Sequence, residues 1–195
     1  MVISTFISDL VLSLVSFYVS YQFKSASSIS YRAALYGFTI IATSAGLGAI
    51  HFLGINVIDS IYSFFVGLAS CVGVPLLGLA FFHLGIRTIT ERFFTFKVLS
   101  MFIGYLLFVY VFPMPMYSTI VGGISMVIIL IVGLLKWRRN QTAAVLAISG
   151  AALFVIAGLV VGTRGKTGII LNVDIFHILL AIANLVIGKA ILKLR

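Results

Sequence analysis

The sequence predicts an all-α integral membrane protein, a seven-helix bundle that forms a single transmembrane domain over residues 1–195. Hydrophobic residues make up 62% of the 195 residues and charged residues only 9%, and the mean hydropathy of +1.26 lies outside the range of soluble proteins. The chain divides into apolar spans close to the ~20 residues that a helix needs to cross a bilayer. These spans are apolar at odd and even positions alike, whereas barrel strands are shorter and alternate.

Short connections separate the spans, so almost no chain remains for a soluble domain. The first span has no basic region before it and contains Asp9, so we expect a retained helix rather than a cleaved signal peptide. Cys71 is the single cysteine, which excludes an internal disulfide and a cysteine metal cluster. The predicted helices are Ile3–Phe23, Ala33–Ile55, Asp59–Leu84, Phe93–Phe112, Tyr117–Leu135, Ala143–Val161 and Ile169–Leu192.

The basic residues predict the orientation of the bundle. The net charge is +9, and only Arg164 and Lys166 lie on the side of the N-terminus. The other eleven of the thirteen basic residues lie on the opposite side, which the positive-inside rule places in the cytoplasm. We therefore expect a multi-pass protein of the inner cell membrane with its N-terminus outside and its C-terminus inside. The run Lys136–Arg139 suits anionic lipid headgroups, and no nucleic-acid partner is expected.

Acidic and imidazole side chains gather at the outer face of the predicted bundle. Only four acids occur in the chain, and such groups are costly in hydrocarbon. From the predicted helix bounds, Asp9, His51, Asp174 and His177 lie at similar depths in the outer leaflet. The predicted helices that carry them are neighbours in a closed ring. Asp59, by contrast, is interpreted as a simple acid at the start of the third helix.

The residues that flank these groups indicate which helix faces point inward. Asp9, Ser13, Ser16 and Ser20 form one polar stripe along the first helix. In the last helix, Asp174, His177 and Asn184 share a face. The second helix approaches His51 through Ser44 and a run of small residues, which favours close packing of neighbouring backbones.

Two segments carry a resemblance to known proteins. The segment Gly46–His51, in which glycines lead to a histidine, and the Asp-x-x-His of Asn172–His177 resemble an uncharacterised family of small bacterial seven-helix membrane proteins. The layout is remotely similar to the superfamily of alkaline ceramidases and adiponectin receptors. That resemblance implies a zinc-dependent membrane hydrolase with one histidine ligand in helix 2 and two in helix 7. Here Asp174 would replace a missing histidine ligand.

Two classes of function follow. The first is a metal-dependent hydrolase that acts on a lipid or an amide, with His51, Asp174 and His177 as zinc ligands. Asp9 or Ser44 would orient the zinc-bound water as catalytic residues. The second is a non-catalytic sensor, a ligand or ion binder, or a subunit that works with a membrane protein partner. A haem held by two histidines is a third possibility, and retinal is disfavoured because Lys189 lies in the last turn.

Overall fold

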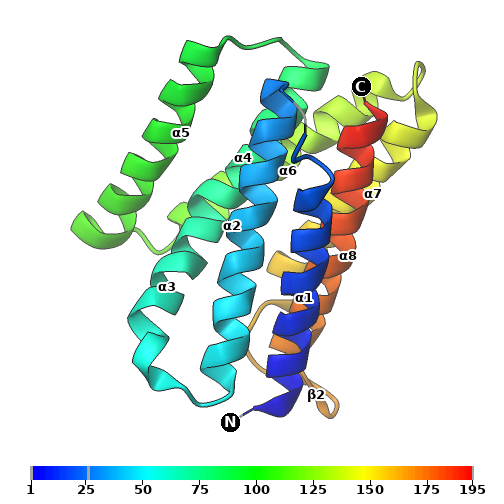
Figure 1. Cartoon of the computed structure of the whole chain (residues 1–195). Coiled ribbons are helices and arrows are strands. Elements are labelled where there is room, and N and C mark those ends of the chain that lie inside the picture. Colours follow the sequence, from blue (N-terminus) through cyan, green and yellow to red (C-terminus); the bar gives the residue numbers. More distant parts are fainter. Residues whose placement is uncertain (1, 26, 195) are drawn as a thin grey trace.

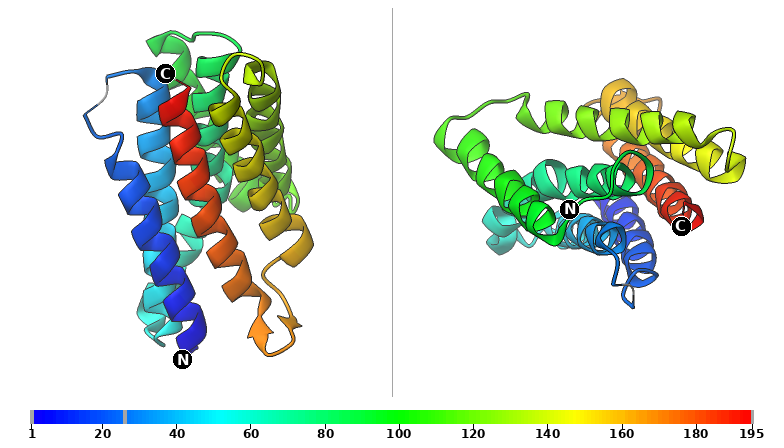
Figure 2. Two further views of the ribbon diagram at one scale, coloured as in Figure 1. Left: turned by 90° about the vertical axis from the view of Figure 1, so that its right-hand side faces the viewer. Right: turned by 90° about the horizontal axis from the view of Figure 1, so that it is seen from above.

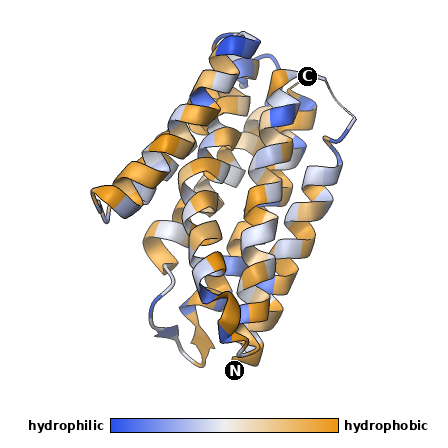
Figure 3. Ribbon diagram, turned by 60° about the vertical axis from the view of Figure 1, so that its left-hand side comes forward, coloured by the Kyte–Doolittle hydropathy of each residue, from blue (hydrophilic) through white to orange (hydrophobic). Residues whose placement is uncertain are grey.

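The computed structural model describes residues 2–25 and 27–194. Seven helical spans long and apolar enough to cross a membrane run through this part of the chain. They stand side by side as a bundle with the two termini at opposite ends (Figure 1). The all-α membrane fold predicted from the sequence is therefore confirmed, and a lipid bilayer is its environment. Figure 3 shows hydrophobic residues over most of the helices, with hydrophilic residues concentrated near the helix ends.

The first three spans include a pair of closely packed helices and an interrupted helix. α1 (Ile3–Tyr21) packs along α2 (Ile29–Phe52), and the 3₁₀ turn η1 (Asn56–Ile58) leads into the third span. That span consists of α3 (Asp59–Leu68), the π-helical turn η2 (Ala69–Gly73) and α4 (Val74–Gly85). A π turn inserts an extra residue and redirects the helix without ending it.

The next spans continue the bundle. α5 (Glu91–Leu106) ends in the π turn η3 (Leu107–Val111), and α6 (Tyr117–Lys136) follows. α7 (Gln141–Val155) ends in the π turn η4 (Ile156–Val161). A two-stranded hairpin, β1 (Lys166–Thr167) and β2 (Ile170–Leu171), then leads into α8 (Asn172–Lys193), which packs against α1 and α7. Figure 2 shows α8 beside α1, although they lie at opposite ends of the chain.

Capping and turn residues explain why several helix bounds differ from the predicted ones. α2 begins four residues earlier than predicted because the Ser28 hydroxyl accepts a hydrogen bond from the Tyr31 N–H. It ends three residues earlier, at Phe52, and Gly54 then takes a positive φ of 92°. The last helix begins at Asn172 rather than at Ile169 because the preceding residues form the hairpin. Hydropathy leaves out the polar first turn of α2 and assigns the apolar residues of the following turn and of the hairpin to helices.

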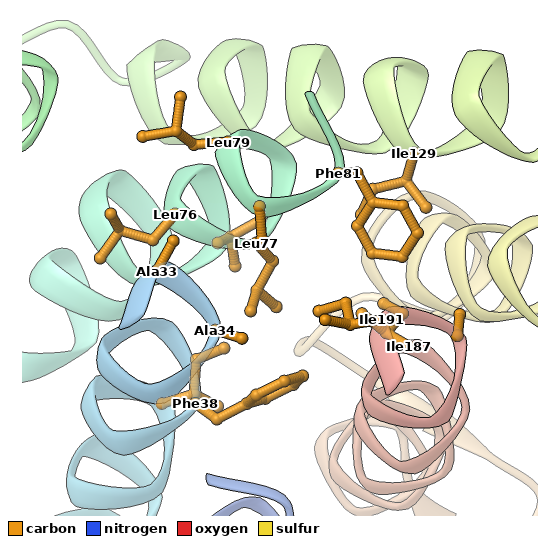
Figure 4. Close-up of a cluster of buried hydrophobic side chains, with 14 of the residues drawn as sticks. Ala33, Ala34, Phe38, Leu76, Leu77, Leu79, Phe81, Ile129, Ile187 and Ile191 are labelled. Carbon is orange, nitrogen blue, oxygen red and sulfur yellow. The ribbon is translucent and has the colours of Figure 1, made fainter. Parts of the chain in front are cut away.

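The apolar core and the buried polar side chains occupy different parts of the bundle. The main core joins α2, α4, α6 and α8, with fully buried side chains such as Phe38, Leu77, Ile129 and Ile187 (Figure 4). The acidic and imidazole groups buried in α1 and α8 lie toward the N-terminus of each helix. Along α8, the buried polar residues near the N-terminus therefore precede the residues of the apolar core.

Candidate functional site

A buried carboxylate and a buried imidazole face each other across the α1–α8 interface. Asp9 of α1 is 2% exposed and His177 of α8 is 8% exposed. Asp9 Oδ1 lies 3.3 Å from His177 Nδ1. Asp9 follows the start of α1 by six residues and His177 follows the start of α8 by five, so both lie about 8 to 9 Å along their helices. The pair is thus placed at one level of the bundle.

The hydroxyl of Ser8 extends this pair to a second carboxylate. Ser8 Oγ lies 3.2 Å from His177 Nδ1 and 3.3 Å from Asp174 Oδ1, and 3.1 Å from the Thr5 carbonyl oxygen. A hydroxyl has one hydrogen, so Ser8 donates to only one of these acceptors at a time, and its oxygen accepts from His177 when Nδ1 carries the proton. Asp9, His177, Ser8 and Asp174 are therefore connected by contacts along which hydrogen bonds can rearrange. We call these four residues the Asp9 cluster.

The second oxygen of Asp9 lacks a partner within the described residues. Asp9 Oδ2 is buried and forms no hydrogen bond there. A Cβ atom added at Gly48 of α2 would lie 2.5 Å from this oxygen and 3.1 Å from the Tyr62 ring. The backbone of α2 therefore packs directly against the carboxylate, which only a glycine allows. A buried carboxylate oxygen without a hydrogen bond is costly, so a negative charge on Asp9 is poorly stabilised at this position.

His51 takes part in a different pair. Its Nδ1 lies 2.8 Å from Asp59 Oδ1, and both side chains are partly exposed. The imidazole also stacks on Tyr62, with ring centroids 4.8 Å apart. Asp59 does begin α3, as its interpretation as a helix-start acid requires, but it also pairs with His51. Tyr62 touches both the His51 ring and the space beside Gly48, so it stands between the two pairs.

The structure thus brings together only part of the predicted zinc-ligand set. Asp174 and His177 share the Asp9 cluster, whereas His51 lies with Asp59. Across residues 2–25 and 27–194, no group of three or more His, Cys, Asp or Glu side chains is placed to hold a metal ion. Both His51 and Asp174 lie near the ends of their helices, so their different partners follow from helix packing rather than from depth. His51 is one residue from the end of α2, and Asp174 lies in the first turn of α8.

Ser44 lies apart from the Asp9 cluster, and the polar stripe of α1 forms hydrogen bonds with neighbouring helices. Ser44 is buried in α2, but none of the hydrogen bonds in the described chain joins it to the Asp9 cluster. Ser13 donates to the Ala42 carbonyl over 2.9 Å, and Asn184 donates to Ser16 Oγ over 2.9 Å. Together with Ser20, which donates to the Leu35 carbonyl, these residues bind α1 to its neighbours. The predicted inward orientation of the stripe is confirmed by its burial.

Two contributors were missed in the sequence. Ser8 precedes Asp9 and falls outside the stripe spacing of three and four, yet the packing of α8 brings it to His177 and Asp174. A search for any hydroxyl beside an intramembrane acid would have found it. Tyr62 carries no such signal, because tyrosines are common near helix ends in membrane proteins.

One family of proteins matches nearly the whole chain. The model of a family of unknown function, DUF6962, matches residues 4–195. The chain belongs to the DUF6962 family. This agrees with the expected membership of an uncharacterised family. No curated protein and no solved structure matches the chain, so the remote similarity to alkaline ceramidases and adiponectin receptors stays a prediction.

Proposed function

We propose that this DUF6962 member is a proton-binding membrane module, with Asp9 and His177 as the groups that share the proton. The observation that carries the proposal is the buried Asp9 carboxylate. One of its oxygens contacts His177 Nδ1 at 3.3 Å, and the other has no partner in the described chain. None of the ion pairs there brings a lysine or an arginine to it. A proton on Asp9 neutralises the buried carboxylate, and a neutral carboxyl group costs less to bury than a charged one.

The space around Asp9 favours a proton over a metal ion. The backbone at Gly48 packs so closely against Asp9 Oδ2 that an added Cβ atom would lie 2.5 Å from it, and a proton needs no additional volume. A metal would also need further ligands at bonding distance, whereas His51 is engaged with Asp59. These contacts support the ion-binder class of function over the zinc-dependent hydrolase, and they assign no lipid or amide substrate.

The contacts of the Asp9 cluster suggest how a proton would act on the bundle. Ser8 and Asp9 belong to α1, and Asp174 and His177 belong to α8, so a proton that is gained or lost at their mutual contacts alters hydrogen bonds across one helix interface. The connecting loops of the described chain are short. We propose that the module reports proton occupancy to a membrane protein partner, as a sensor or as a subunit of an assembly in the inner membrane.

The proton site is tested by infrared spectroscopy of the purified protein in lipid. We expect the carbonyl stretch of a protonated carboxylic acid to be present at low pH and to fade as the pH rises and Asp9 loses its proton. Asp9→Asn should abolish the band, and His177→Gln should shift its pH dependence. Asp59→Asn, which alters the partly exposed pair, is the matched control and should leave the band in place.

Two outcomes would contradict this proposal. The band would be equally strong in Asp9→Asn and in the unmodified protein if another acid held the proton. Stoichiometric zinc in the purified protein, lost in both His51→Ala and His177→Ala, would instead support the metal-dependent hydrolase. In that case zinc binding should release protons and weaken at low pH, because its ligands must be deprotonated.

The proposed inner-membrane topology predicts where reporters fused to the chain are active. A reporter fused after Arg195 should be cytoplasmic, because the sequence places eleven of the thirteen basic residues on that side. A reporter inserted at Pro113, between η3 and α6, should be active only outside the cytoplasm. The inverse pattern of paired alkaline phosphatase and fluorescent-protein fusions would overturn the proposed orientation.

A further inference from the structure

α5 is the span least integrated in the bundle. Of its residues, only Phe94 and Tyr105 are buried. In Figure 1 it stands to one side of α2 and α4, and in the view from above in Figure 2 it diverges from α6. A cavity of about 370 Å³ lies between α4, α5 and α6. Its volume falls in the range of small-molecule and acyl-chain sites.

The lining of this cavity is apolar along its length and has one charged side chain. Leu79, Met101 and Ile128 are typical of its walls, and Tyr117 lines the end near the start of α6. Lys97 is the charged residue of the lining. It lies six residues into α5, about 9 Å from the helix start, on the side with the most basic residues.

Lys97 has no acidic partner in the described chain. None of the ion pairs there includes it. Its Nζ instead lies over the rings of Phe93 and Phe96, 5.3 and 5.9 Å from their centroids. A lysine within a membrane span, unpaired and beside an apolar cavity, is an expected partner for an anionic group. The nearest source of such groups is the anionic lipid of the leaflet in which it lies.

We propose that the cavity between α4, α5 and α6 binds one acyl chain of an anionic phospholipid, whose phosphate pairs with Lys97. The apolar walls take the chain, and the single lysine at the basic end of the cavity takes the headgroup. This site is separate from the Asp9 cluster, which lies between α1 and α8. A bound lipid would fill the space that separates α5 from the bundle and hold this span in place.

Thermal unfolding of the full chain in detergent, with phosphatidylglycerol or phosphatidylcholine added, tests the headgroup. Phosphatidylglycerol should raise the unfolding temperature at lower concentration than phosphatidylcholine. Lys97→Gln should weaken the apparent affinity for phosphatidylglycerol about fivefold and remove the preference. Lys97→Arg should retain it. Lys189→Gln is the matched control, because Lys189 is an exposed lysine of α8 that does not line the cavity.

The acyl chain is tested by filling the cavity. Val121→Trp places a large side chain in its lining and should abolish saturable stabilisation by both lipids. Val127→Trp, on the exposed face of α6, should leave it unchanged. Equal responses of Lys97→Gln and the unmodified protein would overturn the proposal. A lipid-free dimer in native mass spectrometry that Val121→Trp converts to a monomer would also overturn it, because a second copy would then cover the cavity.

Discussion

His177→Ala should lower the free energy of unfolding by about 3 kcal/mol at a pH where Asp9 is ionised, because it leaves a buried carboxylate without its partner. In the native bundle, His177 Nδ1 contacts Asp9 Oδ1 at 3.3 Å and Ser8 Oγ at 3.2 Å. Since Asp9 Oδ2 already lacks a hydrogen bond in the described chain, removing the imidazole isolates Asp9 further. Reversible unfolding by sodium dodecyl sulfate in mixed micelles measures the loss.

A double-mutant cycle separates the Asp9–His177 contact from a general packing defect. Adding Asp9→Asn to His177→Ala should recover part of the lost stability, since a neutral amide is cheaper to bury than an unpaired carboxylate. Asp59→Asn, which breaks the partly exposed pair with His51, should cost about 1 kcal/mol or less. A cost for His177→Ala no larger than that for Asp59→Asn would show that the buried pair contributes little.

Gly37→Val should destabilise the bundle by about 2 to 3 kcal/mol through a steric conflict between α2 and the interrupted third span. A Cβ atom at Gly37 would lie 2.8 Å from the Gly73 carbonyl oxygen in η2 and 2.9 Å from Leu77 Cδ2. The first contact involves backbone, so the two helices would have to separate. Cys71, which is 1% exposed in the same π turn, provides a local probe.

The unfolding measurement should therefore be paired with thiol labelling. Gly37→Val should make Cys71 react faster with a maleimide, because displacement of η2 loosens the packing around its own buried thiol. The matched control is Gly123→Val in α6, where an added Cβ atom has no neighbour within 4 Å. Its stability should stay within about 0.5 kcal/mol. Equal losses for the two variants would assign the effect to valine in a helix rather than to the close approach.

The burial of the polar stripe of α1 shows how far polar spacing predicts a helix face. Asp9, Ser13 and Ser16 repeat at three and four residues, so they had to share one side of α1. In a bilayer that side faces other helices rather than lipid, and the structure places it there. The partners of the stripe could not be predicted from the same spacing, because the rotation and height of α8 depend on packing.

Sequence by itself determined the class of this protein, the number of its spans and the polar face of α1. These properties follow from hydropathy and helical periodicity, which are local along the chain. Only the tertiary structure decided that His177 joins Asp9 and Ser8 while His51 joins Asp59. Those partners depend on how the helices pack, as in the close approach of Gly48 to Asp9. Hydropathy and periodicity along one helix do not contain that information.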